Sequence, residues 1–164
     1  MKNHKADIRS APPSAGRRLN IPLLRRCVKA ALQAEGADIP CEVSVLITDD
    51  EGIRALNRTH RKKDEPTDVL SFPMHAMTPG KFNSDPSEIN PETGRLPLGD
   101  IVLSAERVAA QAEEYGQSTD RETAYLTVHS VLHLLGYDHQ DEGKEKRRMR
   151  QREEAILQIL GLQK

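Results

Sequence analysis

The chain has 164 residues, and its 24 Lys and Arg residues nearly balance 25 Asp and Glu residues, for a formal net charge of −1. This length suits one domain with a sizeable core. No apolar run approaches the roughly 18 residues of a membrane span, and the basic N-terminus lacks the apolar segment of a secretory signal. Cys27 and Cys41 are expected to be free thiols in a cytoplasmic protein. If a chain this close to neutral binds nucleic acid, it needs a local basic patch.

The first part of the chain alternates between predicted helices and strands. Residues 1–17 are expected to form a flexible N-terminal arm, although "ADIRS" could add a short edge strand, and residues 18–164 to form a single domain. Helical spacing over 20–36 predicts a helix with Pro22 near its first turn. The alternating segment 41–48 predicts a strand.

Further elements follow in the same manner. A helix is expected from Asp49 or Asp50 to about residue 61, because acidic residues favour a helix N-terminus. A second strand is predicted at 67–73, and residues 74–97 should form a long surface loop. "GDIVLS" (99–104) predicts a third strand.

The rest of the chain is predicted to be mostly helical. Ser104 should cap a helix that ends at Gly116, and Thr119 or Asp120 should cap a longer helix stopped by Gly136. A last helix is expected from about residue 141 to 160. Strands that come early and are interleaved with helices predict an α+β fold, with one small mixed sheet packed against helices.

The segment "HSVLHLLGYDH" places three histidines at spacings of four and six residues. His129 and His133 would lie one turn apart on one helix face, as in the zincin motif HExxH, so both rings could reach one ion. Gly136 can end the helix and let the chain turn back, which would bring His139 to the same ion. Three protein nitrogens would leave a fourth position open, as catalytic sites require. The pattern HxxxHxxGxxH therefore predicts a metal site, although a helix core could also accommodate two hydrogen-bonded histidines.

Two neighbouring residues limit the chemistry. Ser130 stands where a metalloprotease has its general-base Glu, which weakens the case for a zincin-type peptidase. Asp138 could orient a ligand ring through a hydrogen bond, and capping of the turn is an equally good account of it.

Two basic segments are candidates for RNA contact. Arg61, Lys62 and Lys63 end the second predicted helix, where cations complement the helix dipole. If the fold brings Arg61 near the metal, its guanidinium could hold a phosphate. The C-terminal "KEKRRMRQREE" is expected mainly to form the solvated face of the last helix, with RNA contact as the alternative. Aromatic residues make up only 3% of the chain, with no Trp, which argues against a stacking platform for single strands.

Together these motifs resemble those of the YbeY family of metal-dependent endoribonucleases. "HSVLHLLGYDH" is similar to the family pattern HGxLHLxGYDH, and "LNRTHRKKDEPTDVLSFP" (56–73) and "LGDIVLS" (98–104) resemble two further family segments. The resemblance covers roughly residues 41–160. It implies that His129, His133 and His139 bind one Zn²⁺ ion and that Arg61 engages the substrate near it. The chain departs from the family pattern at Ser130, at His60, in the loop 74–97 and in the N-terminal arm.

The resemblance implies a zinc-dependent endoribonuclease that cuts single-stranded regions during ribosomal RNA maturation and ribosome quality control. The expected partners are ribosomal RNA and the small ribosomal subunit or its proteins, with no membrane. The alternatives are a non-catalytic, zinc-stabilised ribosome-assembly module and a zincin-type peptidase. Three imidazoles would also accept nickel or copper.

Overall fold

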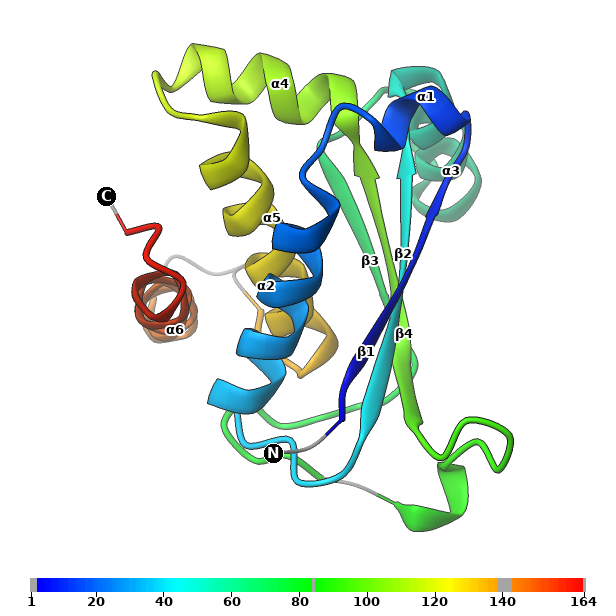
Figure 1. Cartoon of the computed structure of the whole chain (residues 1–164), viewed down its shortest axis with the longest axis vertical. Coiled ribbons are helices and arrows are strands. Elements are labelled where there is room, and N and C mark those ends of the chain that lie inside the picture. Colours follow the sequence, from blue (N-terminus) through cyan, green and yellow to red (C-terminus); the bar gives the residue numbers. More distant parts are fainter. Residues whose placement is uncertain (1–2, 84, 139–142, 164) are drawn as a thin grey trace.

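The structure, a computed structural model, describes residues 3–83, 85–138 and 143–163. In chain order its elements are β1 (Lys5–Ser10), α1 (Pro13–Gly16), α2 (Ile21–Ala34), β2 (Cys41–Thr48), α3 (Asp50–Arg61), β3 (Val69–Pro73), η1 (Pro86–Glu88), β4 (Leu96–Ser104), α4 (Ala105–Glu114), α5 (Thr119–Leu134) and α6 (Lys144–Ile159). One sheet is covered on one face by α2 and α5, and α6 packs outside them (Figure 1). Within the described ranges, no helix is both long and apolar enough to cross a membrane.

The four strands form one mixed sheet in the order β1-β2-β4-β3. β2 is parallel to both β1 and β4, whereas β3 is antiparallel to β4. In β2, Val43, Val45 and Ile47 point into the core at every second position, as the alternating sequence predicts. The expected α+β fold with one small mixed sheet is confirmed.

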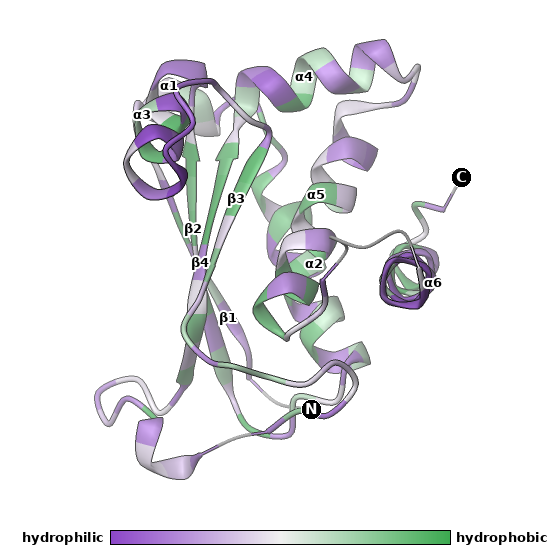
Figure 2. Ribbon diagram, turned by 180° about the vertical axis from the view of Figure 1, so that it is seen from behind, coloured by the Kyte–Doolittle hydropathy of each residue, from purple (hydrophilic) through white to green (hydrophobic). Residues whose placement is uncertain are grey.

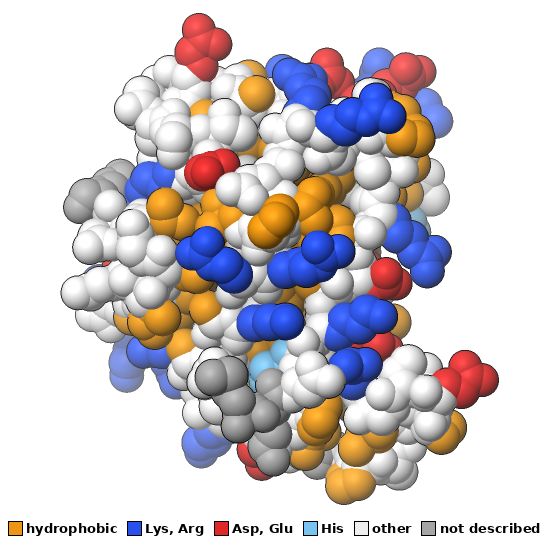
Figure 3. All heavy atoms as spheres, viewed as in Figure 1, with side chains coloured by type: hydrophobic (Ala, Val, Ile, Leu, Met, Phe, Trp, Pro, Cys, Tyr) orange, Lys and Arg blue, Asp and Glu red, His pale blue; other side chains and the backbone are white. Residues whose placement is uncertain are grey.

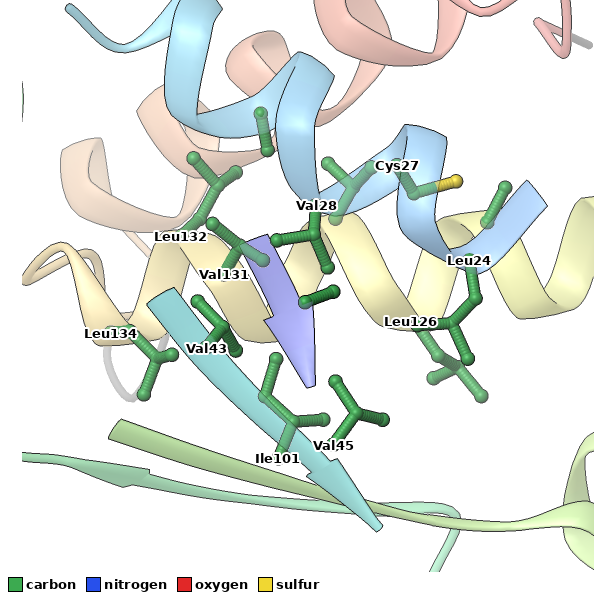
Figure 4. Packing of buried hydrophobic residues seen from close by; sticks show 14 of the residues in the cluster. Leu24, Cys27, Val28, Val43, Val45, Ile101, Leu126, Val131, Leu132 and Leu134 are labelled. Atoms are coloured by element: carbon green, nitrogen blue, oxygen red, sulfur yellow. The ribbon is translucent and has the colours of Figure 1, made fainter. Parts of the chain in front are cut away.

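The main core lies between the sheet and the pair α2 and α5. Side chains of α2, α5, β2 and β4 interlock there, as Figure 4 shows for Val28, Val131 and Ile101 among others. In Figure 2 the apolar colouring of the strands and of α5 contrasts with the largely polar α6. Because α5 is surrounded by other elements, most of its side chains are buried, and it forms a rigid support for the histidines.

The N-terminal segment differs from the flexible arm expected over residues 1–17. Residues 5–10 form β1, the edge strand that "ADIRS" allowed, and α1 follows. The backbone N–H of Cys41 donates to Nδ1 of the buried His4 at 3.1 Å. Thr48 Oγ1 donates to the carbonyl of Ala11 at 2.7 Å. Pairing with β2 accounts for this order, because the backbone groups along that edge of β2 need hydrogen-bond partners.

Several element boundaries also differ from the expected ones. Ser118, and neither Thr119 nor Asp120, caps α5, with its Oγ accepting from Arg121 N at 3.0 Å. β4 begins at Leu96 instead of residue 99, and α6 begins at Lys144 instead of about residue 141. β3 begins two residues later than expected. Such shifts arise because caps and strand ends depend on tertiary contacts.

The positive charge is unevenly distributed, despite the near-zero total. Figure 3 shows Lys and Arg side chains gathered over the face that α2 presents to solvent. α2 carries the exposed Arg25, Arg26 and Lys29 and contains no acidic residue. The chain therefore has a local basic surface. Because its net charge is small, electrostatic binding of nucleic acid would require such a surface.

Candidate metal centre and active-site cleft

The first two histidines of the motif lie near the C-terminal end of α5. His129 and His133 are one turn apart and half-buried, whereas their neighbours Val128, Val131 and Leu132 are fully buried. Packing of these neighbours against the core fixes the rotation of α5 about its axis. The histidine side chains are therefore held on the one side of α5 that borders an open cleft.

The two imidazole rings converge through their Nε2 atoms, which lie 3.1 Å apart. The ring planes are nearly perpendicular, at 85°. Zinc–nitrogen distances of about 2.0–2.1 Å in a tetrahedral site place two ligand nitrogens roughly 3.3 Å apart. The observed separation is close to that value, so the pair is preorganised for one ion.

The hydrogen bonds at the opposite ring nitrogens fix the tautomer of each histidine. Nδ1 of His133 donates to the carbonyl of Tyr137 at 2.9 Å. Nδ1 of His129 donates to a carboxylate oxygen of Glu153. Because both partners are acceptors, we assign the ring protons to Nδ1 and a lone pair to each Nε2. Two Nε2 lone pairs directed at one point can bind a single cation, so these residues fit a metal ion.

Glu153 is a site residue that the sequence reasoning missed. It lies on α6, is 5% exposed, and reaches His129 across 24 positions of sequence. Metal-binding histidines commonly donate their second N–H to a carboxylate, which orients the ring and increases its basicity. A signal was present in the sequence. Glu153 interrupts the apolar stripe of Met149, Ile156 and Leu157, and a carboxylate on a buried stripe needs a partner.

The turn after α5 follows the predicted break at Gly136. Gly136 has φ +99°, and a Cβ added there would lie 2.0 Å from the carbonyl oxygen of Met77. The turn is closed by Tyr137 N donating to Leu132 O at 3.0 Å, and it directs the Tyr137 carbonyl towards His133. The loop that follows β3 thus packs against the turn, and only glycine fits between them.

The Tyr137 side chain anchors this turn through contacts with Glu35 and Arg148. Its hydroxyl donates to the carboxylate of Glu35, and the guanidinium of Arg148 lies 5.7 Å from the ring centre. Burial, followed by the hydrogen bond to Glu35, raises the pKa of Tyr137 to about 12, so the phenol remains a donor at neutral pH. Glu35 and Arg148 hold the Tyr137 side chain in place. The backbone carbonyl of Tyr137, which orients His133, is therefore held in place as well.

The remaining predicted residues of the motif are only partly placed. Asp138 is exposed and borders the cleft, and its predicted contact with a ligand ring stays a prediction. His139, the third expected ligand, lies outside the described residues. Within those described ranges no group of three or more metal-binding side chains occurs.

A cleft of about 700 Å³ brings the two sequence motifs together. Arg61, at the end of α3, lines it with His129 and His133, and β3 forms a further wall. The loop after α3 is held by Asn57 Nδ2 donating to Glu65 O at 2.9 Å and by the salt bridge from Arg54 to Asp64, also 2.9 Å. Lys62 and Lys63 do not line this cleft. The fold thus places one cation of the basic cluster beside the histidines.

The arrangement can bind a metal ion and an anionic group side by side. The two histidines form one wall of the cleft, and the exposed guanidinium of Arg61 offers a planar set of donors on another. A phosphodiester next to the ion could therefore receive charge-assisted hydrogen bonds from Arg61.

The chain is similar to known proteins over most of its length. Residues 17–161 match the family described as Endoribonuclease YbeY. A relative of that name from Roseiflexus sp. is 46% identical over 156 residues, covering 95% of this chain and 92% of its own. Another from Clostridium acetobutylicum is 52% identical over 141 residues, covering 82% and 84%. The fold resembles a Thermotoga maritima protein solved in solution, with a TM-score of 0.59, 21% identity, and coverage of 96% and 92%. The chain therefore belongs to the Endoribonuclease YbeY family.

Proposed function

We propose that this protein is a metal-dependent endoribonuclease that cleaves single-stranded regions of ribosomal RNA. The main structural support is the convergence of two lone-pair nitrogens, from His129 and His133, in the same cleft as Arg61. The names of its relatives support the reaction class. RNA is the substrate, and the small ribosomal subunit or its proteins are proposed partners.

We further propose one Zn²⁺ ion per chain, held by His129, His133 and His139. Imidazole nitrogens with an ordered hydrogen-bond partner at Nδ1 suit zinc. A zinc ion there would supply a Lewis acid and lower the pKa of water towards neutrality. Two free, buried thiols are consistent with the proposed location in the cytoplasm.

The protein's own residues have distinct tasks in this proposal. Glu153 and the Tyr137 carbonyl hold the rings of His129 and His133 in the orientation described above. Arg61 binds a non-bridging oxygen of the scissile phosphate and stabilises the charge that develops on it. The walls of the cleft orient the strand, which converts a bimolecular attack into an ordered one.

The peptidase alternative is disfavoured by the position of Ser130. This side chain is fully buried, and its Oγ has no hydrogen-bond partner among the described residues. It does not line the cleft, so it cannot act there as a general base. The assembly-module alternative is disfavoured by the open cleft beside the histidines, because structural zinc sites are closed.

A substrate panel tests the proposal. The purified protein is incubated with unstructured RNA, an RNA duplex, DNA of the same sequence and a generic peptide, each with and without chelator. We expect cleavage of the unstructured RNA alone, abolished by chelator and restored by Zn²⁺. Turnover of the peptide, or chelator-resistant RNA cleavage at equal purity, would contradict it. A large chelator-induced loss of thermal stability with no turnover of any substrate would favour the assembly module.

A further inference from the structure

A second, smaller cleft adjoins the first beside His129. It measures about 330 Å³, and Asp68, Val69 and His129 line both clefts. Ligand sites in proteins start at about 300 Å³, so this space suits one small unit of a ligand, such as a single nucleotide. Its position next to a predicted metal ligand makes it continuous with the proposed active site.

One face of α6 forms the basic wall of this second cleft. Lys146 and Arg150 are four positions apart and Glu153 follows after three, so all three lie on the same side of the helix. Glu153 faces His129 from there. The two cations are therefore placed within two turns of the residue that orients the metal site.

The other cations of the basic C-terminal segment have different roles. Arg148 donates to Pro79 O at 2.9 Å, and Arg152 forms a salt bridge with Glu35 at 2.7 Å. Both stabilise the packing of α6. Arg150, by contrast, is exposed and forms no ion pair within the described part of the chain. Its guanidinium is available to a ligand.

Two cations and two carboxylates line the second cleft, and they differ in how they are engaged. Of the two carboxylates that line it, Glu153 is 6% exposed at its side chain and is directed at His129. Asp68 is half-buried and its Oδ1 accepts from Val69 N at 2.8 Å and from the Thr67 hydroxyl at 3.3 Å. Both carboxylates are thus engaged, whereas the Arg150 guanidinium is open to solvent.

An aromatic ring also borders the second cleft. Tyr125 is half-buried, and its ring centre lies 5.7 Å from that of His129, with the planes tilted by 30°. Aromatic faces bind unpaired bases by stacking, whatever the base.

We propose that the second cleft is a nucleotide subsite for the RNA strand that crosses the active site. The base stacks on Tyr125, and Arg150 with Lys146 binds the adjoining phosphate. The strand then runs from Arg61, past the histidines, to α6. This inference rests on the proposed endoribonuclease function and adds to it the path of the substrate.

The test compares Arg150→Ala with Arg147→Ala, a matched change at an exposed α6 residue that lines neither cleft. Binding of an unstructured, fluorescently labelled RNA is measured by anisotropy over a range of salt concentrations, and cleavage by gel. Each phosphate contact contributes about 0.7 to the slope of log affinity against log salt for single strands. We expect Arg150→Ala to lower this slope by about that amount and to raise KM more than it lowers kcat. Arg147→Ala should resemble the wild type.

Two variants of Tyr125 test whether a base stacks on its ring. Tyr125→Phe keeps the ring and should bind RNA like the wild type, whereas Tyr125→Leu should weaken binding by roughly tenfold.

Equal affinity and salt slope for wild type and Arg150→Ala would overturn the subsite, as would equal losses in Arg147→Ala. If the wild type binds RNA but cleaves none, the proposed function fails while the binding data still decide the subsite. If it neither binds nor cleaves RNA, both fail.

Discussion

Glu153 of α6 accepts a hydrogen bond from Nδ1 of His129 on α5, which couples the C-terminal helix to the histidine pair. The same helix is held against the histidine turn through Arg148, which contacts both Pro79 and the Tyr137 ring. The orientation of the predicted metal ligands therefore depends on the docking of α6 as well as on α5.

Glu153→Gln is expected to weaken zinc binding, because an amide is a poorer acceptor than a carboxylate and leaves the imidazole less basic. Loss of such a partner typically costs about 10- to 100-fold in metal affinity. Competition with a chromogenic chelator measures the change. Glu154→Gln, at the exposed neighbouring position, is the control and should leave affinity unchanged. Equal affinities for the two variants would show that Glu153 does not support the ligand.

Arg61→Ala is expected to reduce RNA cleavage without reducing metal content. Removing one donor that stabilises developing negative charge lowers turnover by roughly 100-fold. Lys63→Ala removes a charge from the same basic cluster at a residue outside the cleft, and should cost little. Steady-state kinetics with zinc analysis of each preparation separate the two effects. A similar loss in both variants would instead indicate non-specific attraction of RNA.

Gly136→Ala is expected to destabilise the fold and disturb the metal site. The new Cβ would meet the Met77 carbonyl at 2.0 Å, and the positive φ adds strain. Gly116 also follows a helix with positive φ, +65°, but no atom lies within 4 Å of its added Cβ. Gly116→Ala should therefore cost only the conformational term, about 1 kcal/mol, and Gly136→Ala clearly more. Urea unfolding of both variants measures the difference, and equal losses would contradict the close approach of Met77.

Stability is expected to fall in alkaline solution because both cysteines are buried. Burial raises the pKa of Cys27 and of Cys41 from 9.0 to about 12. In the unfolded chain the thiols ionise near pH 9, whereas in the folded chain they stay protonated. Their contribution is thus complete below pH 9 and is lost as the pH rises from about 9 to about 12. Urea unfolding at pH 7, 9 and 10 should show this decline, and it should be smaller in Cys27→Ala. An identical pH dependence in that variant would contradict burial of the Cys27 thiol.

Most of the fold could be predicted from local patterns in the sequence. The alternation of "CEVSVLIT" specifies β2, and the glycine at 136 specifies the end of the longest apolar helix. These signals are local, since they depend on side-chain period and on backbone freedom. The N-terminal strand is hard to predict from the sequence because "KADIRS" has little alternation. Its order comes from pairing with β2, which lies more than 30 positions further along the chain. The hydrogen bond between Cys41 N–H and His4 spans a similar separation.

The candidate site, too, could be predicted only in part from local patterns in the sequence. The histidine motif and Arg61 could be singled out from spacing and residue type, but their placement in one cleft depends on β3 lying beside α5. Glu153 is 24 positions from His129, and only the docking of α6 brings the two together. The division of the α6 cations between packing and the second cleft likewise depends on which face of the helix is buried.

In the proposed mechanism, the metal held by the histidines is required for RNA cleavage. The most direct measurement is a titration of metal-free protein with Zn²⁺, in which bound zinc and the rate of RNA cleavage are followed together, with His133→Ala alongside. We predict that cleavage rises in proportion to zinc and levels off at one equivalent per chain, while His133→Ala loses both binding and cleavage. Full cleavage by the metal-free protein, or by His133→Ala of equal purity, would contradict the claim.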